Sequence, residues 1–442
     1  MPKLFINTMG CQMNVYDSTR MADALKVLGY ELTDNQEEAD FLIINTCHIR
    51  EKATDKVFSE VGRFAQIKER RKKEGKDTLI ALAGCVVQAL GDEVLRRYPA
   101  VDIAVGPQSY HQLPELVTQW LRHKGQHLIA QFSSDDKFDH LPKAQANGPT
   151  AFLAIQEGCD HFCSYCVVPY TRGCEYSRPM EDIRAEAQQL VDTGAVEIML
   201  LGQNVDCWHG KDKDNRTSSL AQLLYELSKI EGLKRLRYTT SYPTDITKEM
   251  VEAHKSLPKL MPYIHLPIQS GSDVILKAMN RHYTVEDYMC VVQKLKEARP
   301  DIAISSDFIV GFPGETDKDF EDTLAIVDRV AYAQSFSFKF SARPGTPASL
   351  LHNQISDAVK TERLAILQKS LLQHQKNYNL SFVGKTLPVL LTEKTKKGQW
   401  LGYSPYLQNV HVETADDLYG KIVNLRISAA TASSLTGHQE SV

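Results

Sequence analysis

Long apolar runs are missing from this chain. No uninterrupted apolar stretch is long enough to cross a bilayer, and residues 1 to 7 hold only a short apolar-rich run before polar residues follow. Internal repeats and low-complexity segments are missing too. These absences exclude a membrane-spanning and a repeat architecture, and we expect a cytoplasmic protein.

An excess of either charge is also missing. The 51 Lys and Arg side chains nearly balance 55 Asp and Glu, which gives a formal net charge of -4. Such a chain has no general attraction to nucleic acid, so any RNA contact must come from local basic patches. One dense basic run stands out, and we favour a solvated helix end over a contact with a phosphate backbone. Its members are Lys68, Arg70, Arg71, Lys72, Lys73 and Lys76.

Cysteine is scarce, with nine in 442 residues, and in a reducing compartment this indicates metal binding or catalysis rather than a disulfide framework. Three of them nevertheless crowd together as Cys159, Cys163 and Cys166. They are odd in number and too close for ordinary disulfides, so we interpret them as thiolate ligands of one metal centre. Three thiolates on a four-iron cluster leave one iron open for chemistry.

A structural zinc site is the alternative for this cysteine group. Such a site usually closes with a fourth Cys or His, which Cys174 or His161 could supply. We favour the iron–sulfur cluster, because the open position left by three ligands is typical of a catalytic site. Cys174, Cys207 and Cys290 lack matching partners, and we expect them to be structural.

Strand-like apolar runs alternate with helical patterns over the first 125 residues, which is typical of a parallel α/β sheet. The expected strands are Leu4-Phe-Ile, Phe41-Leu-Ile-Ile, Leu79-Ile-Ala-Leu and Ile103-Ala-Val, and one helix is readable from 51 to 67.

Three further cysteines follow these strands. Cys11, Cys47 and Cys85 each lie just beyond the carboxyl end of an expected strand. Loops at that edge line the ligand crevice of a parallel sheet, so we predict that the three meet in a second metal site. A lone cysteine there would more simply be core packing, but three at equivalent positions favour the site. Gly10 and Gly84 let the backbone turn closely around a bulky ligand.

The middle of the chain predicts a parallel barrel. Residues 131 to 149 carry turn formers without apolar periodicity and are predicted to be a linker. From about 150 to 345 the alternation resumes, with strands expected near Phe152, Glu197, Leu236, Ile264, Ala303 and Ser335. Six βα units instead of eight leave the barrel open on one side. The crowded cysteines follow the first strand, on the face where parallel barrels hold their sites.

The last part changes character. A helical stretch from about 357 to 378 precedes short alternating strands near Leu387, Trp400, Val410 and Lys421, which predict a small all-β barrel. The final dozen residues are expected to be frayed.

Several motifs together resemble one family. The spacing Cys-x3-Cys-x2-Cys is similar to that of the radical S-adenosylmethionine enzymes, and the chain from about residue 3 to 376 resembles the methylthiotransferases of that superfamily. The motifs, besides the cysteine run, are Met9-Gly-Cys-Gln-Met-Asn14, Asn45-Thr-Cys-His-Ile-Arg-Glu51, Leu201-Gly-Gln-Asn-Val205, His265-Leu-Pro-Ile-Gln-Ser-Gly-Ser272 and Ser305-Ser-Asp-Phe-Ile-Val-Gly-Phe-Pro-Gly-Glu315.

Within this family, Gln12 and Met13 resemble the branch of the tRNA-2-methylthio-N6-dimethylallyladenosine synthases, and the runs Arg172-Gly-Cys-Glu-Tyr-Ser-Arg-Pro179 and Ser341-Ala-Arg-Pro-Gly-Thr346 agree. The resemblance implies methylthiolation of carbon 2 of N6-dimethylallyladenosine beside the anticodon of tRNA. Sister branches, which act on threonylcarbamoyladenosine in tRNA or on a ribosomal protein, are the alternative. A non-catalytic RNA-binding or electron-transfer protein with two clusters would need no Gly311-Phe-Pro-Gly-Glu315.

The resemblance also implies cofactors and partners. Two 4Fe-4S clusters are expected, one on Cys159, Cys163 and Cys166 and one on Cys11, Cys47 and Cys85. S-adenosyl-L-methionine is expected at the carboxyl ends of the barrel strands, although helix capping is an equal alternative for each polar residue there. These residues are Gln203, Asn204, Ser241, Gln269 and Asp307. The implied partners are the anticodon stem-loop of tRNA and an electron donor such as flavodoxin or ferredoxin, and a monomer is expected.

The implied fold is α/β with three domains: an N-terminal parallel-sheet α/β methylthiotransferase domain (1–120), a partial (β/α)6 TIM-like radical SAM barrel (145–375) and a small all-β TRAM barrel that binds RNA (377–440). Gly384, Gly402 and Gly420 fit the TRAM pattern, but Gly402-Tyr403-Ser404 stands where the family usually has Gly-Arg-Thr. The resemblance therefore supports the barrel fold and not a particular contact with RNA.

Overall fold

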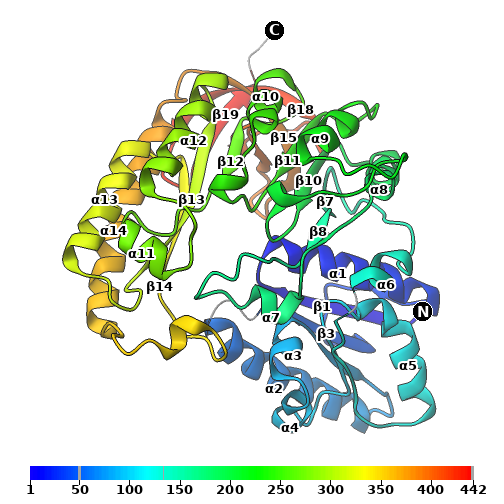
Figure 1. The fold of residues 1–442 in the computed structure, drawn as a ribbon. Helices are drawn as coiled ribbons and strands as arrows, with labels where there is room; N and C mark the ends of the chain where they lie inside the picture. The colour runs from blue at the N-terminus through cyan, green and yellow to red at the C-terminus, as the bar shows by residue number, and fades with distance from the viewer. Residues whose placement is uncertain (48–50, 133, 440–442) are drawn as a thin grey trace.

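The computed structural model describes residues 1–47, 51–132 and 134–439. Three parts follow one another along the chain, and Figure 1 shows the N-terminal α/β part below the barrel, with the C-terminal strands behind the barrel. The motif residues 48–50 and the last residues, 440–442, lie outside the described part of the chain.

The N-terminal part is a six-stranded parallel sheet in the order β2-β1-β3-β4-β5-β6, which confirms the predicted α/β class. Its strands are β1 (Lys3–Met9), β2 (Glu31–Leu32), β3 (Phe41–Thr46), β4 (Leu79–Gly84), β5 (Ile103–Val105) and β6 (His127–Ile129). The short edge strands β2 and β6 were not predicted, because neither begins with an uninterrupted apolar run of the kind that marks the central strands.

Helices cover both faces of this sheet because its central strands are apolar on both sides. One face packs against α1 (Gln12–Leu25) and α5 (Leu113–Arg122), and the other against α2 (Glu51–Lys73), α3 (Cys85–Leu90) and α4 (Glu93–Arg97). The predicted helix from 51 to 67 is therefore the first part of α2.

The basic run at the end of α2 is held largely by ion pairs. Lys68 contacts Asp102 at 2.6 Å, Arg71 contacts Asp40 at 2.5 Å, and Arg70 pairs with Glu37. Lys72, Lys73 and Lys76 are exposed, which agrees with the interpretation as a solvated helix end, but that interpretation is wrong for the buried Arg71.

The predicted linker was wrong in one respect. Residues 131 to 149 contain a short helix, α6 (Ser134–Asp139), and its Lys137 is fully buried. The sequence pattern misses this helix, because its one buried anchor is a lysine instead of an apolar residue.

Six parallel strands form the central barrel, as predicted. They are β7 (Thr150–Ala154), β10 (Glu197–Leu201), β11 (Arg235–Tyr238), β12 (Tyr263–His265), β13 (Ala303–Val310) and β14 (Gln334–Lys339). The order is β11-β10-β7 in one half and β12-β13-β14 in the other, and a single parallel bridge from Leu236 to Leu260 joins the halves.

The connections of the barrel are mainly helical. Their helices are α7 (Val168–Arg172), α8 (Met180–Asp192), α9 (Leu220–Ser228), α10 (Lys248–Ser256), α11 (Asp273–Ala278), α12 (Val285–Ala298) and α13 (Asp317–Val330). Two short strands, β8 (Gln156–Glu157) and β9 (Tyr176–Ser177), pair antiparallel on either side of the cysteine loop and α7.

The long helix α14 (Asp357–Leu380) leads into a closed barrel with the order β15-β16-β17-β19-β18. Its strands are β15 (Thr386–Lys394), β16 (Trp400–Tyr403), β17 (Asn409–Val412), β18 (Ile422–Ala430) and β19 (Ser434–Gln439). The expectation of a frayed end was wrong for most of that segment, because β19 pairs with both β17 and β18 and closes the barrel.

Two buried arginines attach this small barrel to the central one. Arg235 donates to the carbonyl oxygens of Tyr403 and Pro388, and Arg237 donates to those of Ser404 and Pro405, over 2.5 to 2.9 Å. The Tyr403-Ser404 departure from the family pattern therefore lies against the barrel.

A single buried carboxylate neutralises this pair of arginines. Glu197 on β10 lies 3.0 Å from Arg237 and 3.6 Å from Arg235, and all three side chains are at most 3% exposed. Among the described residues, no helix combines the length and apolar character needed to span a membrane.

Replacing Glu197 by Gln should loosen the C-terminal barrel. Two buried guanidinium groups would keep one neutral amide between them, and such broken pairs cost about 3–5 kcal/mol. We expect a lower melting temperature and faster proteolytic release of the segment after α14. Glu181→Gln is the matched control, because Glu181 forms only an exposed pair with Arg184. Equal proteolysis of both variants would contradict this role of Glu197.

Candidate metal centres and cofactor site

The three dispersed cysteines lie at one edge of the N-terminal sheet. Cys11 caps α1 just after β1, Cys47 follows β3, and Cys85 begins α3 directly after β4. Because these strands are neighbours in the sheet, their carboxyl ends converge, and Cys11 accepts a hydrogen bond from the Cys47 thiol. Cys47 and Cys85 are buried and Cys11 is exposed.

Two glycines leave the space that this cysteine group needs. Gly10 has φ +134°, and a Cβ there would lie 2.7 Å from the Cβ of Cys47. Gly84 has φ +97°, and a Cβ there would lie 2.4 Å from the carbonyl oxygen of Thr46. Both positions therefore require glycine, so the close backbone turns expected from the sequence are present.

The thiols of this group differ in acidity. A hydrogen bond from Cys47 lowers the pKa of Cys11 to about 6, the loss of hydration around the sulfur opposes this, and the charge of Arg172 lowers the pKa further. Burial raises the pKa of Cys85, while Arg172 acts against it through its charge and a side-chain hydrogen bond. Soft metal ions bind thiolates, so a ready thiolate at Cys11 suits a metal centre.

The crowded cysteines lie on the loop between β8 and α7. The amide of Cys166 donates to the carbonyl of Cys163 at 2.9 Å, and the Cys166 sulfur accepts from the amide of Val168 at 3.4 Å. Ser164 fastens the loop to the end of α11, where its hydroxyl donates to the carbonyl of Ala278 at 2.8 Å. The loop therefore has a defined shape, in which the three thiols are near enough for the charges of Cys159 and Cys163 to act on Cys166, although their sulfurs do not all lie within 4.8 Å of one another.

A buried arginine also faces this group. Arg281, which is 8% exposed, places a guanidinium nitrogen 3.5 Å from the Cys163 sulfur and makes no ion pair with a carboxylate among the described residues. Burial raises the pKa of Cys159 to about 11 and that of Cys166 to about 12. A negatively charged cluster would offset the guanidinium, so the donor set fits such a group.

The helices next to the two cysteine groups pack against each other. Helix α7, which follows the crowded cysteines, packs against α3, which begins at Cys85. Figure 1 shows α7 and α3 side by side where the N-terminal sheet meets the barrel. The open end of one parallel sheet therefore lies against the site face of the other.

Two of the polar residues expected to contact S-adenosylmethionine touch the cysteine loop. Gln203 accepts a hydrogen bond from the amide of Gly158 at 2.6 Å, and Asn204 contacts His161. Ser241 is buried, and its amide donates to the carbonyl of His265, which joins the two halves of the barrel.

The other two pair with each other in the opposite half of the barrel. The backbone amide of Gln269 donates to the backbone carbonyl of Asp307 at 3.0 Å, and Gln269 has φ +76°. Phe162 and Thr240 have φ +46° and +75°, so three non-glycine residues around the barrel mouth hold a backbone conformation that costs energy. Such residues gather at functional sites.

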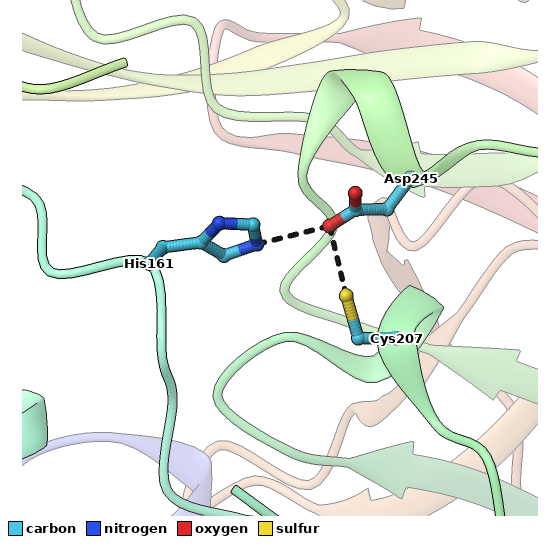
Figure 2. Close-up of side chains that lie close together, drawn as sticks. All are labelled: His161, Cys207 and Asp245. Carbon is cyan, nitrogen blue, oxygen red and sulfur yellow. Dashed lines mark hydrogen bonds and ion pairs between the residues drawn. The ribbon is translucent and has the colours of Figure 1, made fainter. Parts of the chain in front are cut away.

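A hydrogen-bonded hub fastens the cysteine loop to two strand ends. Figure 2 shows His161 from the loop, Cys207 after β10 and Asp245 after β11 pointing toward one another. Oδ2 of Asp245 lies 3.0 Å from Nε2 of His161, 3.0 Å from the Cys207 sulfur and 2.7 Å from the amide nitrogen of Asn204. These bonds outweigh burial, which raises the pKa of Asp245, and hold that pKa below its ordinary value.

By residue type this hub could bind a metal ion, because its ligand atoms lie within 4.8 Å of one another. The amide nitrogen of Asn204 fills the space between them, at 2.8 Å from His161 and 2.9 Å from Cys207. We therefore interpret the hub as a support for the loop. Asp245 was not among the residues expected from the sequence. Cys207, for which no partner was expected, has a defined one in Asp245. Cys174 and Cys290 are exposed.

Three family models match the chain. Residues 3–106 match the uncharacterized protein family UPF0004, residues 153–327 match the radical SAM superfamily, and residues 380–439 match the TRAM domain.

Two curated relatives cover nearly the whole chain. One, from Agrobacterium fabrum, is 53% identical over 98% of this chain and 96% of its own length. The other, from Rickettsia canadensis, is 52% identical over 98% of both. Each bears the name tRNA-2-methylthio-N(6)-dimethylallyladenosine synthase.

Solved structures are similar in fold. The radical S-adenosylmethionine methyltransferase TsrM from Kitasatospora setae superposes with a TM-score of 0.57 at 14% identity, covering 79% of this chain and 77% of its own. The cobalamin-dependent radical enzyme OxsB superposes with a TM-score of 0.53 at 12% identity, covering 82% of this chain and 56% of its own. Both support the fold.

In the metal-free protein, Cys11 should react with iodoacetamide with a half-maximal rate near pH 6, because its pKa is lowered to about 6 and the thiolate is the nucleophile. Alkylation therefore rises between pH 5 and 7 and falls as the medium is acidified. Peptide mass spectrometry measures the extent at each pH.

Cys47→Ala removes the hydrogen-bond donor and should shift the midpoint of Cys11 alkylation to higher pH. Cys290→Ala should leave that midpoint unchanged. An identical pH profile of Cys11 in the wild type and in Cys47→Ala would contradict the interaction.

Proposed function

The chain belongs to the family of the tRNA-2-methylthio-N(6)-dimethylallyladenosine synthases, and on this basis we propose that it adds a methylthio group to carbon 2 of N6-dimethylallyladenosine in tRNA. It is a radical SAM methylthiotransferase. The observation that supports the mechanism is the packing of α7, which follows the crowded cysteines, against α3, which begins at Cys85.

Cys159, Cys163 and Cys166 are the proposed ligands of the first 4Fe-4S cluster. With S-adenosyl-L-methionine bound and an electron donated from outside, such a cluster would supply the reductive chemistry that yields a radical able to take hydrogen from an aromatic carbon. An aromatic C–H offers no acidic proton, so general bases alone cannot activate it. Arg281 contributes a buried positive charge beside Cys163, which favours a reduced, more negative centre.

Cys11, Cys47 and Cys85 are the proposed ligands of the second 4Fe-4S cluster, which supplies the sulfur-bearing centre. Gly10 and Gly84 keep the backbone close without side chains that would fill the space. A second S-adenosyl-L-methionine provides the methyl group.

The proposed cofactor contacts of the barrel are the polar residues at its strand ends. Gln203 and Asn204 hold the cysteine loop, while Ser241, Gln269 and Asp307 line the remaining strand ends. We propose that the methionyl part of S-adenosyl-L-methionine lies near Gln203 and Asn204 and the nucleoside part near Gln269 and Asp307. The half-buried Tyr165 packs against the barrel core beside the cysteine loop.

The proposed division of labour assigns the second cluster to residues 1–120, the radical chemistry to 145–375 and tRNA binding to 377–440. The TRAM match supports binding of the tRNA anticodon stem-loop by the last part. We further propose that the enzyme acts as a monomer in the cytoplasm, where its tRNA is, and receives electrons from a small donor such as flavodoxin or ferredoxin.

Nucleosides from a host that lacks its own enzyme test this function. Wild-type protein should convert N6-dimethylallyladenosine into its 2-methylthio form, whereas Cys163→Ala and Cys85→Ala should yield no product detectable by mass spectrometry. Cys290→Ala, at an exposed position, is the matched control and should retain conversion.

Cleavage of S-adenosyl-L-methionine under reduction separates the two centres. It should be lost in Cys163→Ala and kept in Cys85→Ala, because only the first centre holds the cofactor. Product at the wild-type rate from Cys85→Ala would refute the role of the second centre. Methylthiolated threonylcarbamoyladenosine or a methylthiolated ribosomal protein, with N6-dimethylallyladenosine unchanged, would point to the alternative substrates.

A further inference from the structure

The turn after α11 holds the loop of the crowded cysteines on both sides of Cys163. The side-chain amide of Asn280 donates to the backbone carbonyls of His161 at 3.3 Å and Phe162 at 3.0 Å. Ser164 donates to the two backbone carbonyls that precede Asn280, at 2.8 Å from its hydroxyl and 2.9 Å from its amide. These hydrogen bonds fasten both neighbours of Cys163 to a single turn.

This turn is a helix end of defined geometry. The backbone amide of Asn280 donates to the carbonyl of Lys277 at 3.1 Å, and that of Arg281 donates to the carbonyl of Leu276 at 2.9 Å, which is a Schellman motif. The motif needs a residue in the left-handed conformation, and Asn280 has φ +57°. Glycine is the usual residue there because it adopts this conformation without steric cost. Asparagine adds a side chain that glycine lacks, and that side chain holds the cysteine loop.

One of the two loop residues that Asn280 holds has a strained backbone. Phe162 has φ +46°, which is unfavourable for a bulky side chain, and its ring is 49% exposed, so packing of the ring contributes little to this conformation. The hydrogen bond from Asn280 stabilises it instead. Because each peptide group is planar, fixing the two carbonyls also fixes the N–H groups of Phe162 and Cys163.

The same turn brings a buried positive charge to the loop. Arg281 follows Asn280 directly, and its guanidinium lies 3.5 Å from the Cys163 sulfur. Hydrogen bonds to the carbonyl of Pro267 at 2.9 Å and the hydroxyl of Tyr283 at 2.8 Å fix the direction of this guanidinium. Two consecutive residues therefore determine the shape of the loop and the charge beside Cys163.

We infer that Asn280 is a positioning residue for the first metal centre, because its side chain sets the path of the chain between Cys159 and Cys163 and thereby the positions of two ligands. This inference rests on the proposed first cluster. Residues that hold the ligands of a metal without touching it typically contribute roughly 10- to 100-fold to metal affinity. Glycine could make the turn alone, so the hold on the two carbonyls is a separate role of the asparagine side chain.

Asn280→Gly separates the two roles of this residue. Glycine keeps the left-handed turn and removes only the hydrogen bonds to the loop. Asn280→Asp keeps the size of the side chain but replaces the donor by a carboxylate, which only accepts hydrogen bonds and repels the two carbonyls. Asn215→Gly is the matched control, because Asn215 has φ +60° but is exposed and makes no side-chain hydrogen bond among the described residues.

The measurement uses the full chain with Cys11, Cys47 and Cys85 all replaced by Ala, so that only the first centre remains. Iron release to a chelator gives the retention of the cluster, and electron paramagnetic resonance of the reduced protein reports its surroundings. Asn280→Gly and Asn280→Asp should release iron roughly 10- to 100-fold faster than this background protein. Their resonance lines should be broader, because the ligands are no longer held in one geometry. Asn215→Gly should match the background in both measurements.

The outcomes separate the inference from the function on which it rests. If the background protein binds no iron, the proposed first centre is wrong. If it holds a cluster and Asn280→Gly matches Asn215→Gly in iron release and resonance lines, Asn280 only makes the turn and the inference is wrong. Iron release from Asn280→Asp at the background rate would also contradict it, because the hydrogen-bond donor would then not matter.

The melting temperature of the metal-free variants distinguishes a loosened loop from a failed turn. Asn280→Gly should melt at the temperature of the metal-free background protein, because glycine suits the left-handed turn. Faster iron release accompanied by a clearly lower melting temperature would mean that the turn itself had failed, which would overturn the inference.

Discussion

The structure depends on a buried charge cluster that holds two parallel sheets end to end. Asp17 belongs to the first sheet's helix layer, Glu157 and Arg172 flank the cysteine loop of the barrel, and Lys137 comes from the connecting segment. Buried ions are costly unless each is paired, so these elements must meet in one arrangement. That arrangement brings the strand ends of both sheets, and hence both cysteine groups, to the same junction.

Each cysteine group then has its own electrostatic surroundings. Arg172, which ends the helix after the crowded cysteines, has its charge balanced by two carboxylates, whereas Arg281 lies beside Cys163 without a carboxylate partner among the described residues. The ion pairs of Arg172 are present without a cofactor, whereas the charge of Arg281 remains for a negatively charged cluster to neutralise. Two iron–sulfur centres in one protein can thereby be held and tuned separately, which a reaction that both makes a radical and transfers sulfur requires.

Much of this could be predicted from the sequence. Apolar runs placed the six barrel strands and the main strands of the N-terminal sheet, because buried parallel strands are continuously apolar. The rule that strand ends converge brought Cys11, Cys47 and Cys85 to one edge. The edge strands β2 and β6, the short pair β8 and β9, and β19 with its Gly437 and His438 carry no such pattern and were missed.

The contacts that join the parts were also beyond the sequence pattern. Lys137 lies in a segment that resembles a linker, and nothing local indicates that it is buried against Glu157. Likewise, the hub of His161, Cys207 and Asp245 joins residues of three separate loops. Long-range polar contacts depend on how the whole chain packs, whereas the periodicity of a sequence indicates only local secondary structure.

The central claim is that one chain holds two four-iron clusters on separate cysteine groups. Iron and sulfide analysis with Mössbauer spectroscopy on the anaerobically reconstituted protein tests it most directly. The account predicts about eight irons per chain, falling to about four when either cysteine group is replaced by alanine. About four irons in the wild type, unchanged by replacement of Cys11, Cys47 and Cys85, would contradict it.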